Sequence, residues 1–185
     1  PSVAPTSISG TATICEGTST TLTLVGGTQG TNATAQWFLG SCGGTSAGTG
    51  NSITVSPTIT TTYYVRYSGD CNTTTCASVT VIVNPLPVAA GTISGPTAVC
   101  QGEESVNYSI PAIANATNYI WTLPAGASIT SGANTNSITV DFDVTAISGN
   151  ITVYGQNACG TGATATLAVT VNISPLIVSN YTATI

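Results

Sequence analysis

The 185-residue sequence contains no His, no Lys and no Met, and Arg66 is its only cationic side chain. Without a cluster of Lys and Arg a chain cannot neutralise phosphates, which disfavours nucleic acid and anionic membrane surfaces as partners. Without His there is no Ser-His-Asp or Cys-His catalytic arrangement, and no zinc site that mixes Cys and His. We therefore expect no enzyme activity, no metal site and no cofactor.

Long apolar runs are also missing, and no stretch approaches the roughly 18 residues needed to span a bilayer. We therefore expect no direct membrane insertion. No signal peptide is recognisable, so we expect a mature segment or a fragment. The polar surface must come from neutral groups, because 36 Thr and 19 Ser accompany only six acids and a formal net charge of −5.

Two of the acids, Asp141 and Asp143, alternate on a predicted strand and so share one face. Such a pair can contribute to a Ca²⁺ site with a loop carbonyl, but calcium loops generally carry more acids. We interpret both residues, and Glu103-Glu104, as solvated surface. None of them is paired at active-site spacing.

The main feature is an internal repeat on either side of Asn84-Pro-Leu-Pro87. Five landmarks recur in the same order, displaced by 84 to 88 residues, and a repeat of this length is typical of tandem domains. The landmarks are Ile8-Ser-Gly10 and Ile93-Ser-Gly95, Ile14-Cys-Glu-Gly17 and Val99-Cys-Gln-Gly102, Trp37 and Trp121, Ser52-Ile-Thr-Val55 and Ser137-Ile-Thr-Val140, and Val83-Asn84 and Val171-Asn172.

The repeat predicts two small domains, residues 1–84 and 88–172, joined by a proline linker at 85–87. Residues 173–185 are interpreted as a linker and the start of a further module, or as a pairing strand. Period-two alternation and β-branched residues predict strands, whereas no window shows helical periodicity. We expect an all-β fold of two sandwiches, with strands at 20–25, 33–39, 52–55, 60–67 and 76–83, and at 105–110, 118–123, 137–142, 150–154 and 164–171. Residues 40–50 and 68–75 are predicted loops.

Six cysteines in a chain without His indicate disulfides formed in an oxidising compartment. Within the second module only Cys100 and Cys159 can pair. Cys159 precedes the last predicted strand of its module, as Cys71 does in the first module. This equivalence pairs the cysteines as Cys15–Cys71, Cys42–Cys76 and Cys100–Cys159.

A topological objection keeps a rival pattern open. The turn after the first strand and the turn before the last normally lie at opposite ends of a sandwich, too far apart for a bond. Pairing Cys15 with Cys42 and Cys71 with Cys76 avoids this problem, but it requires a bond between adjacent modules.

The aromatic residues divide between core and surface. Trp37 and Trp121 occupy matching places in a central strand, which favours a core role over a sugar-stacking platform. On the predicted strand 60–67, Tyr63 and Tyr67 share one face and Tyr64 takes the other. Tyr64 and Asn72, beside the variable loops, are therefore our candidate ligand-binding residues.

Several of these segments resemble a known family. Trp37 to Gly44, Gly48 to Pro57, Thr60 to Arg66 and Cys71 to Val81 are similar to the immunoglobulin-like repeat of very large surface proteins of the Bacteroidetes. Residues 93–172 resemble the PKD-like repeat of the same proteins. The resemblance implies tandem modules in adhesins, some used in gliding motility, that leave the cell by the type IX secretion route. It implies no catalytic residues and an extracellular or outer-surface location.

We therefore interpret the chain as a structural or adhesive repeat segment of a surface or filament protein, a stalk stabilised by disulfides. Its expected partners are neighbouring modules of the same chain, with surface polysaccharide or other copies of itself as further candidates. The alternatives are a module that binds a glycan or protein, and a subunit of a self-assembling fibre.

Overall fold

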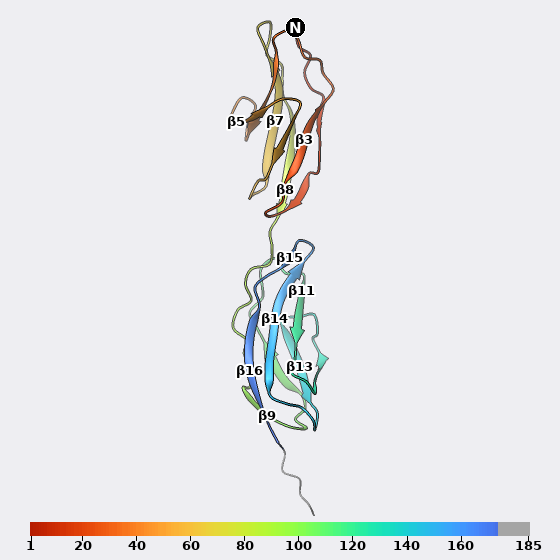
Figure 1. Cartoon of the computed structure of the whole chain (residues 1–185), viewed down its shortest axis with the longest axis vertical. Coiled ribbons are helices and arrows are strands. Elements are labelled where there is room, and N and C mark those ends of the chain that lie inside the picture. Colours follow the sequence, from red (N-terminus) through yellow and green to blue (C-terminus); the bar gives the residue numbers. More distant parts are fainter. Residues whose placement is uncertain (174–185) are drawn as a thin grey trace, which may run out of the picture. The chain divides into compact units, whose positions relative to one another are not determined.

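The structure is a computed structural model that describes residues 1–173. It divides into two compact units, the first from Pro1 to Pro85 and the second beginning at Leu86 (Figure 1). Every regular element in the described residues is a strand, as expected for an all-β fold. Accordingly, residues 1–173 include no helix long and apolar enough to cross a membrane. The tail at 176–185, predicted to be strand-like, lies outside the described residues.

The first unit is a sandwich of two sheets. A three-stranded sheet has the order β1-β3-β6 and a five-stranded sheet has the order β2-β8-β7-β4-β5. The strands are β1 (Ser7–Ser9), β2 (Thr13–Cys15), β3 (Thr20–Val25), β4 (Thr34–Leu39), β5 (Thr45–Thr49), β6 (Ser52–Val55), β7 (Thr61–Ser68) and β8 (Ala77–Asn84).

Alternation along the strands builds the core of the first unit. On β7, Tyr63, Val65 and Tyr67 are buried, whereas Tyr64 and Arg66 between them are only partly buried. Leu22 from the opposite sheet and Trp37 from β4 are completely buried. The predicted division of the three tyrosines between two faces is thus confirmed.

The second unit has the same two-layer plan. Its sheets have the orders β10-β13-β12 and β11-β14-β16-β9, and β15 forms a small hairpin with β14. The strands are β9 (Ala98–Cys100), β10 (Val106–Ser109), β11 (Asn118–Thr122), β12 (Ala127–Ser131), β13 (Ser137–Phe142), β14 (Gly149–Asn157), β15 (Gly160–Thr161) and β16 (Ala165–Asn172).

The core of the second unit is centred on Tyr108, which is completely buried and donates a 3.1 Å hydrogen bond from its hydroxyl to the Pro96 carbonyl. Burial, with a smaller contribution from the negative charge of Glu103, raises the pKa of Tyr108 to about 12. Phe142 and Ile151 pack in the same cluster.

The two units differ in the strand that follows the tryptophan strand. In the first unit β5 pairs with β4, whereas in the second unit β12 pairs with β13, in the other sheet. The prediction that residues 40–50 form only a loop was therefore wrong, because Thr45–Thr49 form β5. The small residues of this segment show no alternation, but they fit a sheet edge where backbone hydrogen bonds alone hold the strand.

Both tryptophans belong to the core, and each satisfies its indole N–H in the same way. The Nε1 of Trp37 donates to the Gly50 carbonyl at 2.8 Å, and the Nε1 of Trp121 donates to the Thr135 carbonyl at 2.9 Å. Each acceptor belongs to the turn before the strand that repeats Ser-Ile-Thr-Val. The indole therefore ties the central strand to that turn.

We expect Trp37→Phe to lower the free energy of unfolding of the first unit by about 1–3 kcal/mol, because the Gly50 carbonyl loses its donor and a small cavity opens. Trp121→Phe should cost a similar amount in the second unit. Urea denaturation monitored by circular dichroism measures both. A loss below about 0.5 kcal/mol for either variant would show that the indole bond is unimportant.

Candidate functional site

The ends of the first unit are joined by a short parallel strand pair. β2 runs beside the last strand, β8, with Thr13 opposite Ile82, Ile14 opposite Val83 and Cys15 opposite Asn84. Two further hydrogen bonds flank this register. The Ile82 N–H donates to the Ala12 carbonyl at 2.8 Å, and the Glu16 N–H donates to the Asn84 carbonyl at 2.9 Å.

The second unit repeats this arrangement bond for bond. β9 runs parallel to β16, with Val99 opposite Val171. The Thr170 N–H donates to the Thr97 carbonyl and the Gln101 N–H donates to the Asn172 carbonyl, both at 2.9 Å. The two three-residue strands β2 and β9 carry too little alternation to be recognised in the sequence, although the Ile14-Cys15 and Val99-Cys100 landmarks mark their positions.

One predicted disulfide is confirmed. Cys42 and Cys76 are bonded, with their Cα atoms 5.9 Å apart and 34 residues apart in sequence. Cys42 lies in the turn between β4 and β5, and Cys76 immediately precedes β8. The bond therefore ties the turn between β4 and β5 across β7 to the start of β8 in the same sheet, and does not join the two sheets.

The other two predicted pairings, Cys15–Cys71 and Cys100–Cys159, are wrong, because Cys71 and Cys100 are exposed free thiols. The topological objection explains the error. Cys15 lies beside Asn84 at the end of β8, whereas Cys71 precedes the start of that strand. Eight strand residues separate the two positions, or about 26 Å, far beyond the reach of a disulfide. β16 separates Cys100 from Cys159 in the same way.

The rival pattern also fails in the first unit, because Cys42 is bonded to Cys76. It required Cys15–Cys42 and Cys71–Cys76 instead. Cys15 and Cys159 are not among the free thiols.

The two candidate ligand-binding residues have different surroundings. The Asn72 side-chain amide is engaged inside the first unit, since its Oδ1 accepts from the Ser2 N–H at 2.7 Å and its Nδ2 donates to the Ser2 carbonyl at 2.9 Å. It anchors the N-terminal segment. Tyr64 lies on the outer face of the five-stranded sheet, partly exposed, beside Arg66.

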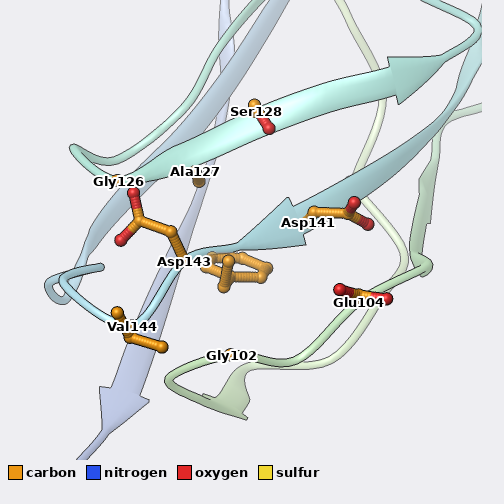
Figure 2. A pocket seen from close by; sticks show the side chains of 9 residues that line it. Gly102, Glu104, Gly126, Ala127, Ser128, Asp141, Asp143 and Val144 are labelled. Atoms are coloured by element: carbon orange, nitrogen blue, oxygen red, sulfur yellow. The ribbon is translucent and has the colours of Figure 1, made fainter.

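Three of the acids line a pocket of about 540 Å³ in the second unit (Figure 2). The carboxylates of Glu104 and Asp141 lie on one side of it, and Asp143 lies on the other. Asp141 Oδ1 accepts the Ser105 N–H at 2.7 Å. Within residues 1–173, no group of three or more His, Cys, Asp or Glu is arranged to hold a metal ion.

Asp143 also has a structural role in its turn. Its Oδ1 accepts from the Thr145 hydroxyl at 2.7 Å and from the Thr145 N–H at 2.6 Å. These hydrogen bonds favour the charged form and lower the pKa of the Asp143 carboxyl. The stabilisation is present above the ordinary pKa of an aspartate and is lost as the pH falls through the lowered value.

Comparison with known proteins agrees with this architecture. Residues 1–85 match the family model described as Ig-like domain CHU_C associated, and residues 86–169 match the model described as PKD-like domain. No curated protein is significantly similar to the chain in sequence.

Solved structures with a similar fold include an I-band fragment from titin. It is 14% identical, with a TM-score of 0.56, and the match covers 92% of this chain and 65% of the fragment. An E-to-A mutated variant of a 3Ig titin structure is 13% identical, with a TM-score of 0.53, and the match covers 93% of this chain and 66% of that one. The chain thus spans slightly less than two thirds of these structures, and at such identity the likeness concerns the fold alone.

Taken together, the sheet orders and the matches define a tandem of β-sandwich repeats of the immunoglobulin-like class. The first of these repeats matches the CHU_C-associated Ig-like model and the second matches the PKD-like model.

The thiols provide a direct test of the bonding pattern. Folded, non-reduced protein treated with a thiol-alkylating reagent should be labelled at Cys71 and Cys100, because both are exposed and free. Digestion with a protease other than trypsin should then yield a peptide cross-linked through Cys42 and Cys76. Mass spectrometry that finds a label on Cys42, or a bond that includes Cys71, would contradict the pattern.

Proposed function

We propose that the chain is a non-catalytic, load-bearing segment of a long extracellular surface protein, in which each repeat resists tension applied along the chain. The observation that carries this proposal is the parallel pair of terminal strands, which occurs in both repeats with the same two flanking hydrogen bonds. The match to Ig-like and PKD-like domains supports a structural role.

The direction of the strands explains the resistance. Tension applied to the N-terminal side of β2, after β1 has separated from β3, and to the C-terminal side of β8 pulls the two strands in opposite directions along their axes. Because the strands are parallel and adjacent, their hydrogen bonds are displaced sideways together and must rupture nearly at once. Strands opened from one end would instead lose their bonds one at a time, at a lower force.

The disulfide adds a limit to extension after the strands separate. Cys42 and Cys76 are 34 positions apart in the sequence, and the segment between them includes β5, β6 and β7. This part of the chain cannot lengthen while the bond is intact. Such a bond persists in an oxidising environment, which supports an extracellular or outer-surface location.

The adhesive part of the proposal rests on the family. A segment of this kind carries a surface-attachment region away from the cell, and neighbouring repeats of the same protein are its immediate partners. Self-assembly into a fibre through residues 176–185 is the competing role from the sequence, and those residues lie outside the described part of the chain.

Single-molecule stretching tests the role of the disulfide. Complete unfolding of the first unit should release more chain when the Cys42–Cys76 bond alone is removed by substitution. The gain is 34 residues at about 3.4 Å each, less the 5.9 Å between the Cα atoms, which gives about 110 Å. The double variant Cys42→Ser/Cys76→Ser should show the longer step without reductant. Equal steps for the variant and the unsubstituted chain, both without reductant, would disprove the limit.

A proline substitution tests the terminal strand pair. Ile82→Pro removes the N–H that donates to the Ala12 carbonyl, while odd-numbered residues of β8 keep their bonds to β7. We expect a lower rupture force and unfolding at least about fivefold faster, the equivalent of one hydrogen bond of about 1 kcal/mol. Ile82→Val keeps the N–H and is the matched control. If the proline and valine variants rupture at the same force, the strand pair does not carry the load.

A further inference from the structure

The only cationic side chain of the protein occupies a central position on the first unit. Arg66 lies on β7, between β4 and β8 in the five-stranded sheet. Its neighbours Val65 and Tyr67 face the core, so the Arg66 side chain lies on the outer face. There its guanidinium stacks over the Phe38 ring, 4.9 Å from the ring centroid.

The guanidinium has no anionic or hydrogen-bonding partner among residues 1–173. Its Nε is buried without an acceptor, and Arg66 as a whole is partly exposed. The acid nearest in sequence, Asp70, accepts a hydrogen bond from the Asn32 amide at 3.0 Å instead. The contact with Phe38 restricts where the guanidinium can lie, and Nη1 and Nη2 remain for an external acceptor.

Two other polar groups on this face lack partners in the described chain. The register of β4 and β7 places Gln36 opposite Arg66, and Phe38 opposite Tyr64. Directly opposite residues on one face have Cβ atoms about 5 Å apart. Gln36 is therefore directly beside Arg66 on the neighbouring strand, and Tyr64 lies two residues along β7 on the same face, opposite Phe38; both are partly exposed.

The Cys42–Cys76 disulfide lies beside this group of side chains. Cys76 lies one residue before Ala77, which is opposite Val65, so the bond to Cys42 crosses the sheet beside Arg66. The turn that carries Cys42 reaches the guanidinium: a Cβ atom on Gly43 would lie 3.3 Å from Arg66 Nη1. The oxidised bond therefore holds this turn against the side chain and limits the directions from which a ligand can approach.

We propose that this outer face of the Ig-like domain, formed by Gln36, Tyr64 and Arg66, binds a uronate unit of an acidic polysaccharide. A planar guanidinium held by stacking is suited to a bidentate contact with one carboxylate. The Tyr64 ring can pack against the apolar face of a sugar, and the Gln36 amide and Tyr64 hydroxyl can bond its hydroxyls. A single cation fits one carboxylate per sugar and does not fit a polyphosphate, which needs several.

The charge of the first unit agrees with this ligand. It contains Glu16 and Asp70 against Arg66, a formal net charge of −1, whereas the second unit contains the other four acids and no cation. An anionic ligand therefore meets less repulsion at the first unit. This site adds a ligand to the load-bearing role and does not depend on it, since binding is measured without force.

The test uses the whole ¹⁵N-labelled chain, titrated with tetragalacturonate and followed by NMR. We expect saturable shifts on β4 and β7, with a Kd of about 1 mM as is typical of a single shallow contact. The same oligomer with every carboxylate methyl-esterified is the matched ligand control, and it should bind at least tenfold more weakly. Equal binding of the ester, or no shift at 10 mM tetragalacturonate, would overturn the proposal.

Variants locate the site. Arg66→Gln and Arg66→Lys should each weaken binding at least tenfold, because the lysine keeps the charge but loses the planar fork. Gln36→Glu should weaken binding to the same extent while keeping the contact between Arg66 and Phe38, because the new carboxylate pairs with the guanidinium and competes with the ligand. Thr21→Glu adds the same charge on the exposed face of the other sheet and should change the affinity less than twofold. If Gln36→Glu and Thr21→Glu weaken binding equally, the site is not at Arg66.

Two further experiments test the chemical class of the ligand and the role of the disulfide. Tetraglutamate should bind at least tenfold more weakly than tetragalacturonate, because it has no sugar ring to pack on Tyr64. Binding of the peptide as tightly as the sugar would replace the polysaccharide with an acidic protein segment. Cys42→Ser/Cys76→Ser should weaken tetragalacturonate binding severalfold, and an unchanged affinity would show that the disulfide does not shape the site.

Discussion

The parallel pairing of a short strand near the start of each repeat with its last strand is the constraint on which each repeat depends. In the first unit β2 leaves the sheet that contains β1 and joins the sheet that contains β8, so one short segment of chain connects the two layers at their edge. The second unit uses β9 and β16 in the same way. Because β2 and β8 are neighbours, β3 to β7 lie outside the direct path between these two strands. The loops and the edge strands β5 and β12 can therefore differ between the two units, as is observed.

Much of this fold could be predicted from alternation and from the repeat. The long strands were recognised because β-branched and aromatic residues alternate with Thr, and the two tryptophans because they recur at matching places. The short strands β2 and β9 could not be recognised by alternation, since three residues hold too little of a period. The edge strands β5 and β12 could not be assigned either, because backbone pairing and not side-chain burial determines where they lie. In the second unit, Pro124 directly after the tryptophan strand turns the chain toward the other sheet.

The cysteines show where reasoning from the repeat fails. The repeat predicted the pair Cys15–Cys71 from equivalent positions in the two modules. Equivalent positions in sequence do not have to be close in space, and the whole length of β8 separates these two cysteines. The bond that does form, Cys42–Cys76, belongs to the first unit alone and lies beside Arg66. The outer face with its unpartnered guanidinium could not be predicted from composition. A single Arg in a chain so poor in charge suggests nothing by itself. Its role depends on the Phe38 contact and on the lack of an ion pair with any acid among residues 1–173.

The central claim is that the terminal strand pair bears load because it is sheared, and the direction of pulling tests this most directly. Stretching the first unit from its two ends shears β2 along β8. Stretching it from attachments at Thr11 and Thr80, which lie at the same end of this pair, opens the pair one bond at a time. The account predicts a clearly higher rupture force for the first geometry at the same loading rate. Equal forces in the two geometries would mean that the strength lies elsewhere in the sandwich.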